Sequence, residues 1–130
     1  MDNIVNIFNV KSTLGANLSD VRDYIASAVP KDKEFATALV FEEAFVNIVN
    51  YAYPNKIGDI EIRFWIKDNN IYLELIDEGI PFNPTNYISR HLDSNNCYIG
   101  GHGIRIIKEM SQNIIYSRTT DNKNKMLIII

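Results

Sequence analysis

The feature that most constrains the fold is a stretch of alternating side chains in the middle of the chain. From Ile60 to Lys67, apolar side chains occupy every second position, and charged or aromatic side chains occupy the others. After the polar residues 68–70 the alternation resumes from Ile71 to Leu75. A period of two is typical of a strand with one buried face, and Asp and Asn favour tight turns. The pattern therefore predicts an antiparallel hairpin with one wet face.

Helical spacing and helix-stopping residues predict the elements before this hairpin. Asn3–Val10 alternates loosely and indicates a first strand. Ser19 is expected to cap a helix that Pro30 ends, and a longer helix is expected from about Asp32 to Tyr51. The longer helix has a wide apolar stripe that we expect to be buried: Phe35, Ala38, Leu39, Ala44, Phe45, Ile48 and Ala52.

The region after the hairpin begins with a long stretch that has no period. Gly79 to Gly103 is rich in Gly, Pro, Asn and Ser, and loops of this length in a compact domain tend to be functional lids. A short helix at Ile104–Ser111 and two strands, Ile114–Arg118 and Met126–Ile130, are expected to follow. This order predicts a two-layer α/β sandwich of the α+β class, with a mostly antiparallel sheet and helices on one face.

Length and composition limit the functional classes. The 130 residues fit a single domain over 1–130, and 46% apolar with 22% charged residues is usual for a globular protein. A net charge of −3 without a basic block argues against nucleic-acid binding. We expect a cytoplasmic, non-membrane protein for three reasons. Cys97 is the single cysteine, the chain starts with polar residues instead of a secretory signal, and no apolar run is long enough to span a bilayer.

The first group of residues that could take part in binding or catalysis lies on the longer helix. Glu43, Asn47 and Tyr51 follow one another at intervals of four, so they are expected on nearly the same helix face, with Asn50 beside them. A carboxylate, an amide and a phenol would project together from a helix that is otherwise apolar. A plain solvent-facing edge remains the alternative interpretation of these residues alone.

The second group closes the hairpin. Asp77 shares the parity of Leu73 and Leu75, so it is expected on the buried face at the very end of the strand, where its carboxylate needs a donor. Gly79 follows, and it would let the backbone turn sharply and a ligand approach closely. An ordinary acidic turn is the alternative.

The third group is a glycine-rich run before the last helix. Gly100, Gly101 and Gly103 flank His102 and precede Ile104. Glycines at a helix start free backbone amides to face an anion, and the helix adds its positive end, an arrangement that suits phosphate groups. A flexible hinge is the alternative. Taken together, the three groups would surround one nucleotide, with its phosphates at residues 101–103 and its base against Asp77.

These residues resemble the ATP-binding boxes of the GHKL ATPase superfamily. Residues 43–47, with Tyr51 and Ala52 after them, resemble the N box, while residues 77–82 and 101–104 resemble the first and second glycine boxes. The order and spacing of the boxes carry the resemblance over most of the chain. Within the superfamily, the small size and the Pro-Phe pair at 81–82 are most similar to the anti-sigma factor serine/threonine-protein kinases.

The resemblance implies a Bergerat fold, ATP and Mg²⁺ as cofactors, and a role for each box. Asn47 would ligate Mg²⁺, Asp77 would accept a hydrogen bond from the amine of adenine, and Glu43 would act as general base toward a serine hydroxyl. These roles suit the preference of Mg²⁺ for oxygen ligands and the positioning that phosphoryl transfer requires. The full set of nucleotide contacts that it implies is Asn47, Asn50, Tyr51, Asp77, Gly79, Pro81, Phe82, Gly101, His102, Gly103 and Ile104.

Three functions are compatible with the sequence. The leading one is an anti-sigma kinase that phosphorylates a serine of a small anti-anti-sigma (STAS-like) protein, with a sigma factor as a further partner and homodimerisation as a family expectation. The alternative is a non-catalytic nucleotide- or partner-binding module that acts by sequestration. The catalytic domain of a histidine kinase is expected less, because the chain has no room before its first strand for a helical pair bearing a phospho-accepting histidine.

Several residues depart from the family pattern or stay outside the boxes. Arg105 puts a charge after the second glycine box, and Arg90 and His91 are lid-side candidates for phosphate contact. With one cysteine and two histidines, a zinc site is not expected. Trp65 is expected to cover the open sheet face or a subunit contact.

Overall fold

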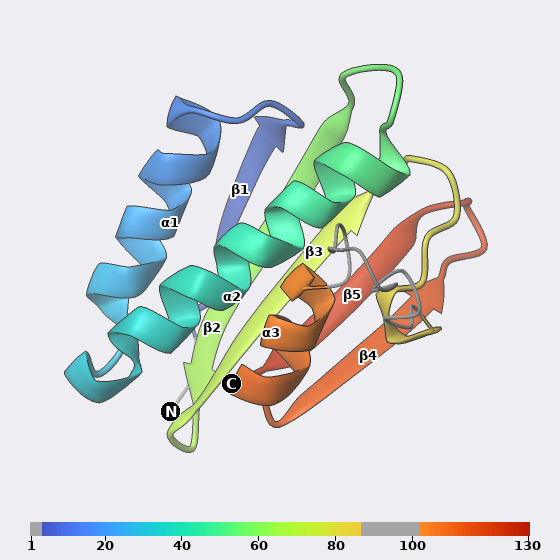
Figure 1. Cartoon of the computed structure of the whole chain (residues 1–130). Helices are drawn as coiled ribbons and strands as arrows, with labels where there is room; N and C mark the ends of the chain where they lie inside the picture. The colour runs from blue at the N-terminus through green and yellow to red at the C-terminus, as the bar shows by residue number, and fades with distance from the viewer. Residues whose placement is uncertain (1–3, 87–101) are drawn as a thin grey trace, which may run out of the picture.

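The computed structural model describes residues 4–86 and 102–130, which form one sheet covered on one face by helices (Figure 1). The strand order is β1-β2-β3-β5-β4, and every neighbouring pair is antiparallel. This confirms the predicted two-layer α/β architecture. The strands are β1 (Asn6–Lys11), β2 (Asp59–Lys67), β3 (Asn70–Asp77), β4 (Asn113–Arg118) and β5 (Asn124–Ile129).

Three α-helices form the second layer, and Figure 1 shows them lying across the same face of the sheet. They are α1 (Ala16–Ala28), α2 (Glu34–Asn47) and α3 (His102–Met110). Short 3₁₀ turns precede α2 at Lys31–Lys33 and follow β3 at Pro84–Asn86, and a π-helical turn extends α2 over Ile48–Ala52. No helix in the described ranges is long and apolar enough to cross a membrane.

The central hairpin has the predicted buried face, and its turn is shorter than the predicted 68–70 because Asn70 already belongs to β3. Asp68 and Asn69 adopt positive φ angles of 52° and 66°, and Lys67 pairs with Asn70. Two left-handed residues in a two-residue loop define a type I′ turn, whose twist matches that of antiparallel strands. The face toward the helices is buried at Ile60, Ile62, Phe64, Ile71, Leu73 and Leu75.

The opposite face of the hairpin carries the one tryptophan. The rings of Trp65 and Tyr72 stack there, with centroids 5.2 Å apart and planes 3° from parallel. Trp65 is half-buried and its parity is opposite to that of the buried Phe64. It therefore lies on the open sheet face, which was one of its two expected places.

Helix α1 begins earlier than predicted. Ser19 lies inside the helix, and the residue before its first turn is Gly15, whose φ of 90° is in the left-handed region. The Gly15 carbonyl accepts the first helical bonds, from the amides of Leu18 (3.1 Å) and Ser19 (2.8 Å). A glycine can reverse the chain there without a steric cost, so no side-chain cap is used. The end of α1 before Pro30 is as predicted.

The buried stripe of α2 was predicted correctly only in its second half. Ala44, Phe45, Ile48 and Ala52 are buried, but Phe35 is 73% exposed. Phe35 precedes Ala44 by about two and a half turns at about 3.6 residues per turn, so the two lie on opposite sides of the helix. Ala38 and Leu39 are half-buried, and the first half of the stripe consists instead of Thr37, Val40 and Phe41.

The C-terminal elements extend slightly beyond their predicted limits. Helix α3 begins at His102 rather than at Ile104, and β5 begins at Asn124 rather than at Met126. Ile104 and Ile107 are buried on α3, which packs against α2. This packing brings the start of α3 beside the second half of α2, next to the end of β3.

Candidate functional site

Side chains from α2, the loop after β3, β4 and β5 enclose a small cavity at the end of β3. Its volume is about 10 Å³, measured as the space open to the centre of a water-sized sphere, which suits about one water molecule. Asp77 and Asn47 contribute polar groups, and Phe82 contributes an aromatic wall. The remaining lining residues are Ile48, Leu75, Pro84, Tyr116, Asn124 and Met126.

Asp77 lies on the buried face, as its parity predicted, and is only 3% exposed. Its Oδ1 atom accepts hydrogen bonds from the Gly79 amide and from Nδ2 of Asn124, both at 2.8 Å. Burial raises the pKa of the Asp77 carboxyl, while the two hydrogen bonds and the charge of Arg118 act in the opposite direction. The site therefore holds a buried carboxylate, one oxygen of which already accepts two hydrogen bonds.

Gly79 meets a spatial requirement that the sequence did not reveal. A Cβ atom there would lie 2.2 Å from the Ala52 carbonyl oxygen and 2.8 Å from the Ala52 Cβ. Gly79 does not adopt a positive φ, so the glycine is required for close approach rather than for a left-handed turn. The Ile80 amide also donates to the Ala52 carbonyl, at 2.9 Å. The end of α2 and the first glycine box are thus in direct backbone contact.

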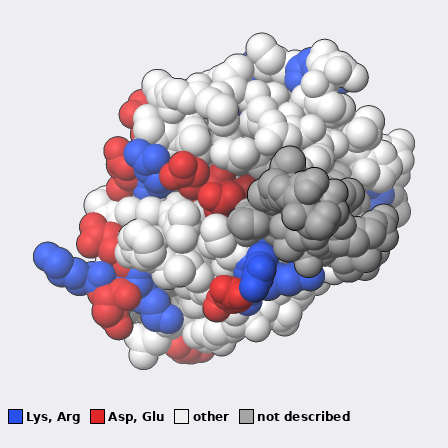
Figure 2. All heavy atoms as spheres, in the orientation of Figure 1, with Lys and Arg blue, Asp and Glu red and all other residues white. Residues whose placement is uncertain are grey.

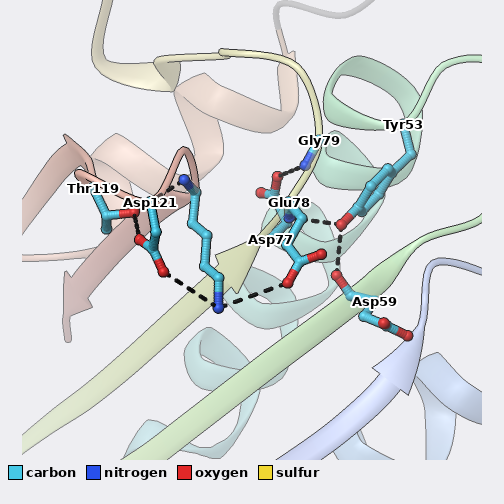
Figure 3. A network of polar contacts seen from close by, with 8 residues as sticks. Tyr53, Asp59, Asp77, Glu78, Gly79, Thr119 and Asp121 are labelled. Carbon is cyan, nitrogen blue, oxygen red and sulfur yellow. Dashed lines mark hydrogen bonds and ion pairs between the residues drawn. The ribbon is translucent and has the colours of Figure 1, made fainter.

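Tyr53 ties the same two segments together, as Figure 3 shows. Its hydroxyl donates to the Asp59 carbonyl and accepts from the Glu78 amide, both at 2.7 Å. The ring also lies over Gly58, where a Cβ would come within 2.2 Å of it. Sequence analysis missed Tyr53, because a single tyrosine before Pro54 has no periodic signal that distinguishes it from a turn residue.

Asn124 is a second residue that sequence analysis missed. It is 4% exposed and pairs in register with Asp77 across β3 and β5. Its Nδ2 donates to Asp77 and to the Ile80 carbonyl, and its Oδ1 accepts from β4 and from the Phe82 amide. Asn124 lies in a polar stretch, and such a stretch indicates a turn. Only the strand pairing reveals that Asn124 lies beside Asp77.

The second chemical centre lies where α2 meets the first turn of α3. A Cβ on Gly103 would be 2.5 Å from Oε1 of Glu43 and 3.6 Å from Nδ2 of Asn47. Asn47 is 5% exposed, and within the described residues its Nδ2 atom has no hydrogen-bond partner. A buried amide without a partner is costly unless a ligand or water satisfies it. The structure therefore brings together Glu43, Asn47 and Gly103, which the sequence places in two separate motifs.

Glu43 and its neighbour Glu42 point to different surroundings. Glu42 forms an ion pair with Arg22 of α1, with Oε1 and the Arg22 guanidinium nitrogen 3.3 Å apart. Partial burial, followed by repulsion from Glu42, raises the pKa of Glu43. A carboxylate with a raised pKa is better suited to accept a proton near neutral pH.

The space-filling view shows both signs of charge mixed over α1 and the first part of α2 (Figure 2).

A π-helical turn follows Asn47. The Tyr53 amide bonds to the Ile48 carbonyl five residues earlier, which widens the turn. Within this turn Tyr51 is half-buried, and its ring stacks on Phe82 with centroids 4.9 Å apart. Asn50 is exposed.

The remaining predicted residues divide into described and undescribed ones. Pro81 is exposed, and Ile104 on α3 is buried, with 2% of its surface exposed. Arg105 forms an ion pair with Glu109 on the surface of α3, at 3.4 Å. Gly101, Arg90, His91 and Cys97 lie outside the described residues. His102 opens α3, but the structure does not describe its side chain.

A family model described as the histidine kinase-like ATPase domain matches residues 11–130. The chain belongs to the histidine kinase-like ATPase family. This membership supports ATP binding by the domain, and it agrees with the GHKL-type fold of an antiparallel sheet with helices on one face.

A curated relative points more narrowly within this family. The chain is 57% identical over 37 residues to the anti-sigma F factor of Caldanaerobacter subterraneus subsp. tengcongensis. The match covers 28% of this chain and 26% of that protein. The aligned part is therefore about a quarter of each chain.

Proposed function

We propose that this domain is an ATP-dependent serine/threonine protein kinase of the anti-sigma type. The observation that carries the proposal is the convergence of Glu43, Asn47 and Gly103 at the start of α3, beside the buried Asp77. Family membership supports the use of ATP, and the local similarity to an anti-sigma F factor supports the regulatory class.

In this proposal the adenine base binds beside Asp77. The carboxylate would accept a hydrogen bond from the exocyclic amine, while guanine would present a carbonyl to the same oxygen and be rejected. Tyr51 and Phe82, which already stack on one another, would provide aromatic surface beside the base. The phosphates would reach the amides of the second glycine box, Gly101 to Ile104, at the positive end of α3.

The residues present fit a magnesium ion near Asn47. Among residues 4–86 and 102–130, no group accepts a hydrogen bond from its buried Nδ2 atom, and an amide nitrogen without such a partner allows the side chain to turn its oxygen toward a cation. The absence of a Cβ on Gly103 keeps the adjacent space open. When bound, Mg²⁺ would neutralise phosphate charge and help to orient the terminal phosphoryl group.

Glu43 would act on the substrate hydroxyl. A serine oxygen forms a bond to the γ-phosphorus, the bond from that phosphorus to the β–γ bridging oxygen breaks, and ADP leaves. The hydroxyl proton passes to the Glu43 carboxylate, whose raised pKa suits a base. Glu43 is half-buried, and its Oε1 atom lies beside Gly103 at the start of α3.

The substrate in this proposal is a small serine-bearing regulatory protein of the anti-anti-sigma (STAS-like) type. A sigma factor is the second partner, which the domain would hold inactive. Both partners follow from the similarity to the anti-sigma F factor rather than from any surface of this chain.

The test compares two adjacent carboxylates. Glu43→Gln should leave ATP–Mg²⁺ binding within about threefold of the wild type and slow phosphate transfer to a STAS-domain protein by about 10²–10⁴-fold. Glu42→Gln is the matched control, because Glu42 pairs with Arg22 instead, and it should retain transfer. Binding is measured by calorimetry and transfer by labelled γ-phosphate.

Each result has a clear consequence. Undiminished transfer by Glu43→Gln would remove Glu43 from the role of base. Binding of ATP and of a protein partner by the wild type, with no transfer, would favour the non-catalytic sequestration module. If the wild type does not bind ATP, the proposed function fails.

A further inference from the structure

Asn124 occupies the centre of a buried polar cluster that the chemistry of phosphate transfer does not use. Its Oδ1 accepts from the Tyr116 hydroxyl at 2.5 Å, from Arg118 at 3.1 Å and from the Phe82 amide at 3.3 Å. Its Nδ2 donates to the Ile80 carbonyl at 2.8 Å. One amide thus joins β4, β5 and the first glycine box.

The remaining bond of this amide reaches the carboxylate of the base site. Nδ2 of Asn124 lies 2.8 Å from Oδ1 of Asp77, which also accepts from the Gly79 amide. Within the described residues, Oδ2 of Asp77 accepts no hydrogen bond. Both donors therefore act on the same oxygen and leave the other one available at the cavity that Asp77 and Asn124 share.

We propose that Asn124 is a positioning residue for base recognition, which fixes Asp77 through Oδ1 so that Oδ2 serves as the acceptor for the amine of a 6-aminopurine. The inference rests on the proposed binding of ATP and adds the residue that sets its selectivity. Asn124 suits this task because an amide can donate to a carboxylate and accept from Tyr116 and Arg118 at the same time. A residue that only accepts would repel the carboxylate, and one that only donates would leave three donors unpaired.

The surroundings of Asp77 make its orientation sensitive to this one donor. The carboxylate is 3% exposed, so water cannot replace a lost bond without entering the cluster. The charged and titratable groups around it come from its own strand end, from β4 and from the turn after α2: Glu78, Arg118, Tyr116 and Tyr53.

The substitution Asn124→Asp removes the Nδ2 donor and leaves the rest of the side chain nearly unchanged. It keeps an oxygen for Tyr116, Arg118 and the Phe82 amide, and it replaces Nδ2 by a second oxygen facing Asp77. The probes are ATP and inosine triphosphate, which carry an amine and a carbonyl at position 6 of the purine. We expect the preference of the wild type for ATP to fall by about tenfold in this variant at about pH 8.5.

Acidification should then restore the preference of the variant. Two carboxylates in contact share a proton, and that proton would replace the missing amide donor as the pH is lowered toward about 5.5. The wild type should show no such recovery. Asn113→Asp is the matched control, because it makes the same chemical change at an exposed residue of β4 that does not line this cavity, and it should keep the preference of the wild type.

The outcomes separate this inference from the proposed function. If the wild type does not bind ATP, the proposed function fails together with the inference. If the wild type prefers ATP and Asn124→Asp weakens both nucleotides equally at every pH, Asn124 has only a structural role and the inference alone is overturned. Should that variant not fold, the uncharged Asn124→Ser gives the same comparison, with a lower preference expected and an unchanged one contradicting the inference.

Discussion

Replacing Gly79 by alanine tests the contact that places the first glycine box. The added Cβ would lie 2.2 Å from the oxygen, 2.6 Å from the carbonyl carbon and 2.8 Å from the Cβ of Ala52. These are mainly backbone atoms at the end of α2, so no flexible side chain can move away to make room. The two segments must separate by about 1 Å to reach ordinary contact distance.

The expected loss follows from the contacts that this separation breaks. Overpacking costs about 1–3 kcal/mol, and the bond from the Ile80 amide to Ala52 contributes about 0.5–1.5 kcal/mol. The sum, about 1.5–4.5 kcal/mol, is a large share of the roughly 5–15 kcal/mol that stabilises a domain. At about 4 °C per kcal/mol for a chain of this size, we expect the melting temperature to fall by about 6–18 °C.

Gly103→Ala provides the comparison. Its Cβ would meet Oε1 of Glu43 at 2.5 Å, but that atom ends a flexible side chain that can turn aside. We expect a loss below about 1 kcal/mol in urea unfolding followed by circular dichroism, together with loss of phosphate transfer because Glu43 is displaced. If Gly79→Ala unfolds within about 1 kcal/mol of the wild type with an unchanged urea dependence, the argument from the Ala52 contact is wrong.

Three further perturbations follow from the structure. Tyr53→Phe should lower the free energy of unfolding by about 1–3 kcal/mol, because the Glu78 amide and the Asp59 carbonyl lose their shared partner; an unchanged urea midpoint would contradict this. Asp77 has a raised pKa in the folded state, so its protonation favours folding at low pH and this contribution is lost as the pH rises through that raised value. The wild type should therefore lose stability relative to Asp77→Asn as the pH is raised from about 4 to 7, and parallel curves for the two proteins would refute the assignment. Asn69→Val should destabilise the hairpin by about 1–2 kcal/mol because its φ is 66°, whereas Asn69→Gly should be neutral or stabilising, as thermal unfolding of the two variants can establish.

Local periodicity accounts for the parts of the fold that were predicted correctly. The alternation from Ile60 to Leu75 indicates which side of each strand is buried. The same parity correctly predicted that Asp77 lies on the inner face. The turn at 68–69 and the helix stop at Pro30 are also local, since they depend on the backbone preferences of a few residues. The three motifs that resemble ATP-binding boxes could be picked out because each is short and contiguous.

Errors occurred where an element's neighbours, rather than its own pattern, decide burial. Phe35 belongs to an apolar helix whose residues allow several stripes, and only packing against the sheet and α1 selects the stripe that excludes it. The π-helical turn at the end of α2 is another feature that the pattern did not reveal, because the competing hydrogen-bond patterns are close in energy and the segments packed against the helix end choose between them.

The sequence by itself determined the order of the elements, the buried face of the hairpin and which residues are candidates to meet a nucleotide. Only the tertiary structure decided that Glu42 pairs with Arg22, that Gly79 lies against Ala52, and that Asn124 holds Asp77. The physical reason is one of distance along the chain. Periodicity describes a side chain relative to its own backbone, whereas these contacts join segments that only the packing of helices on the sheet brings within hydrogen-bonding range.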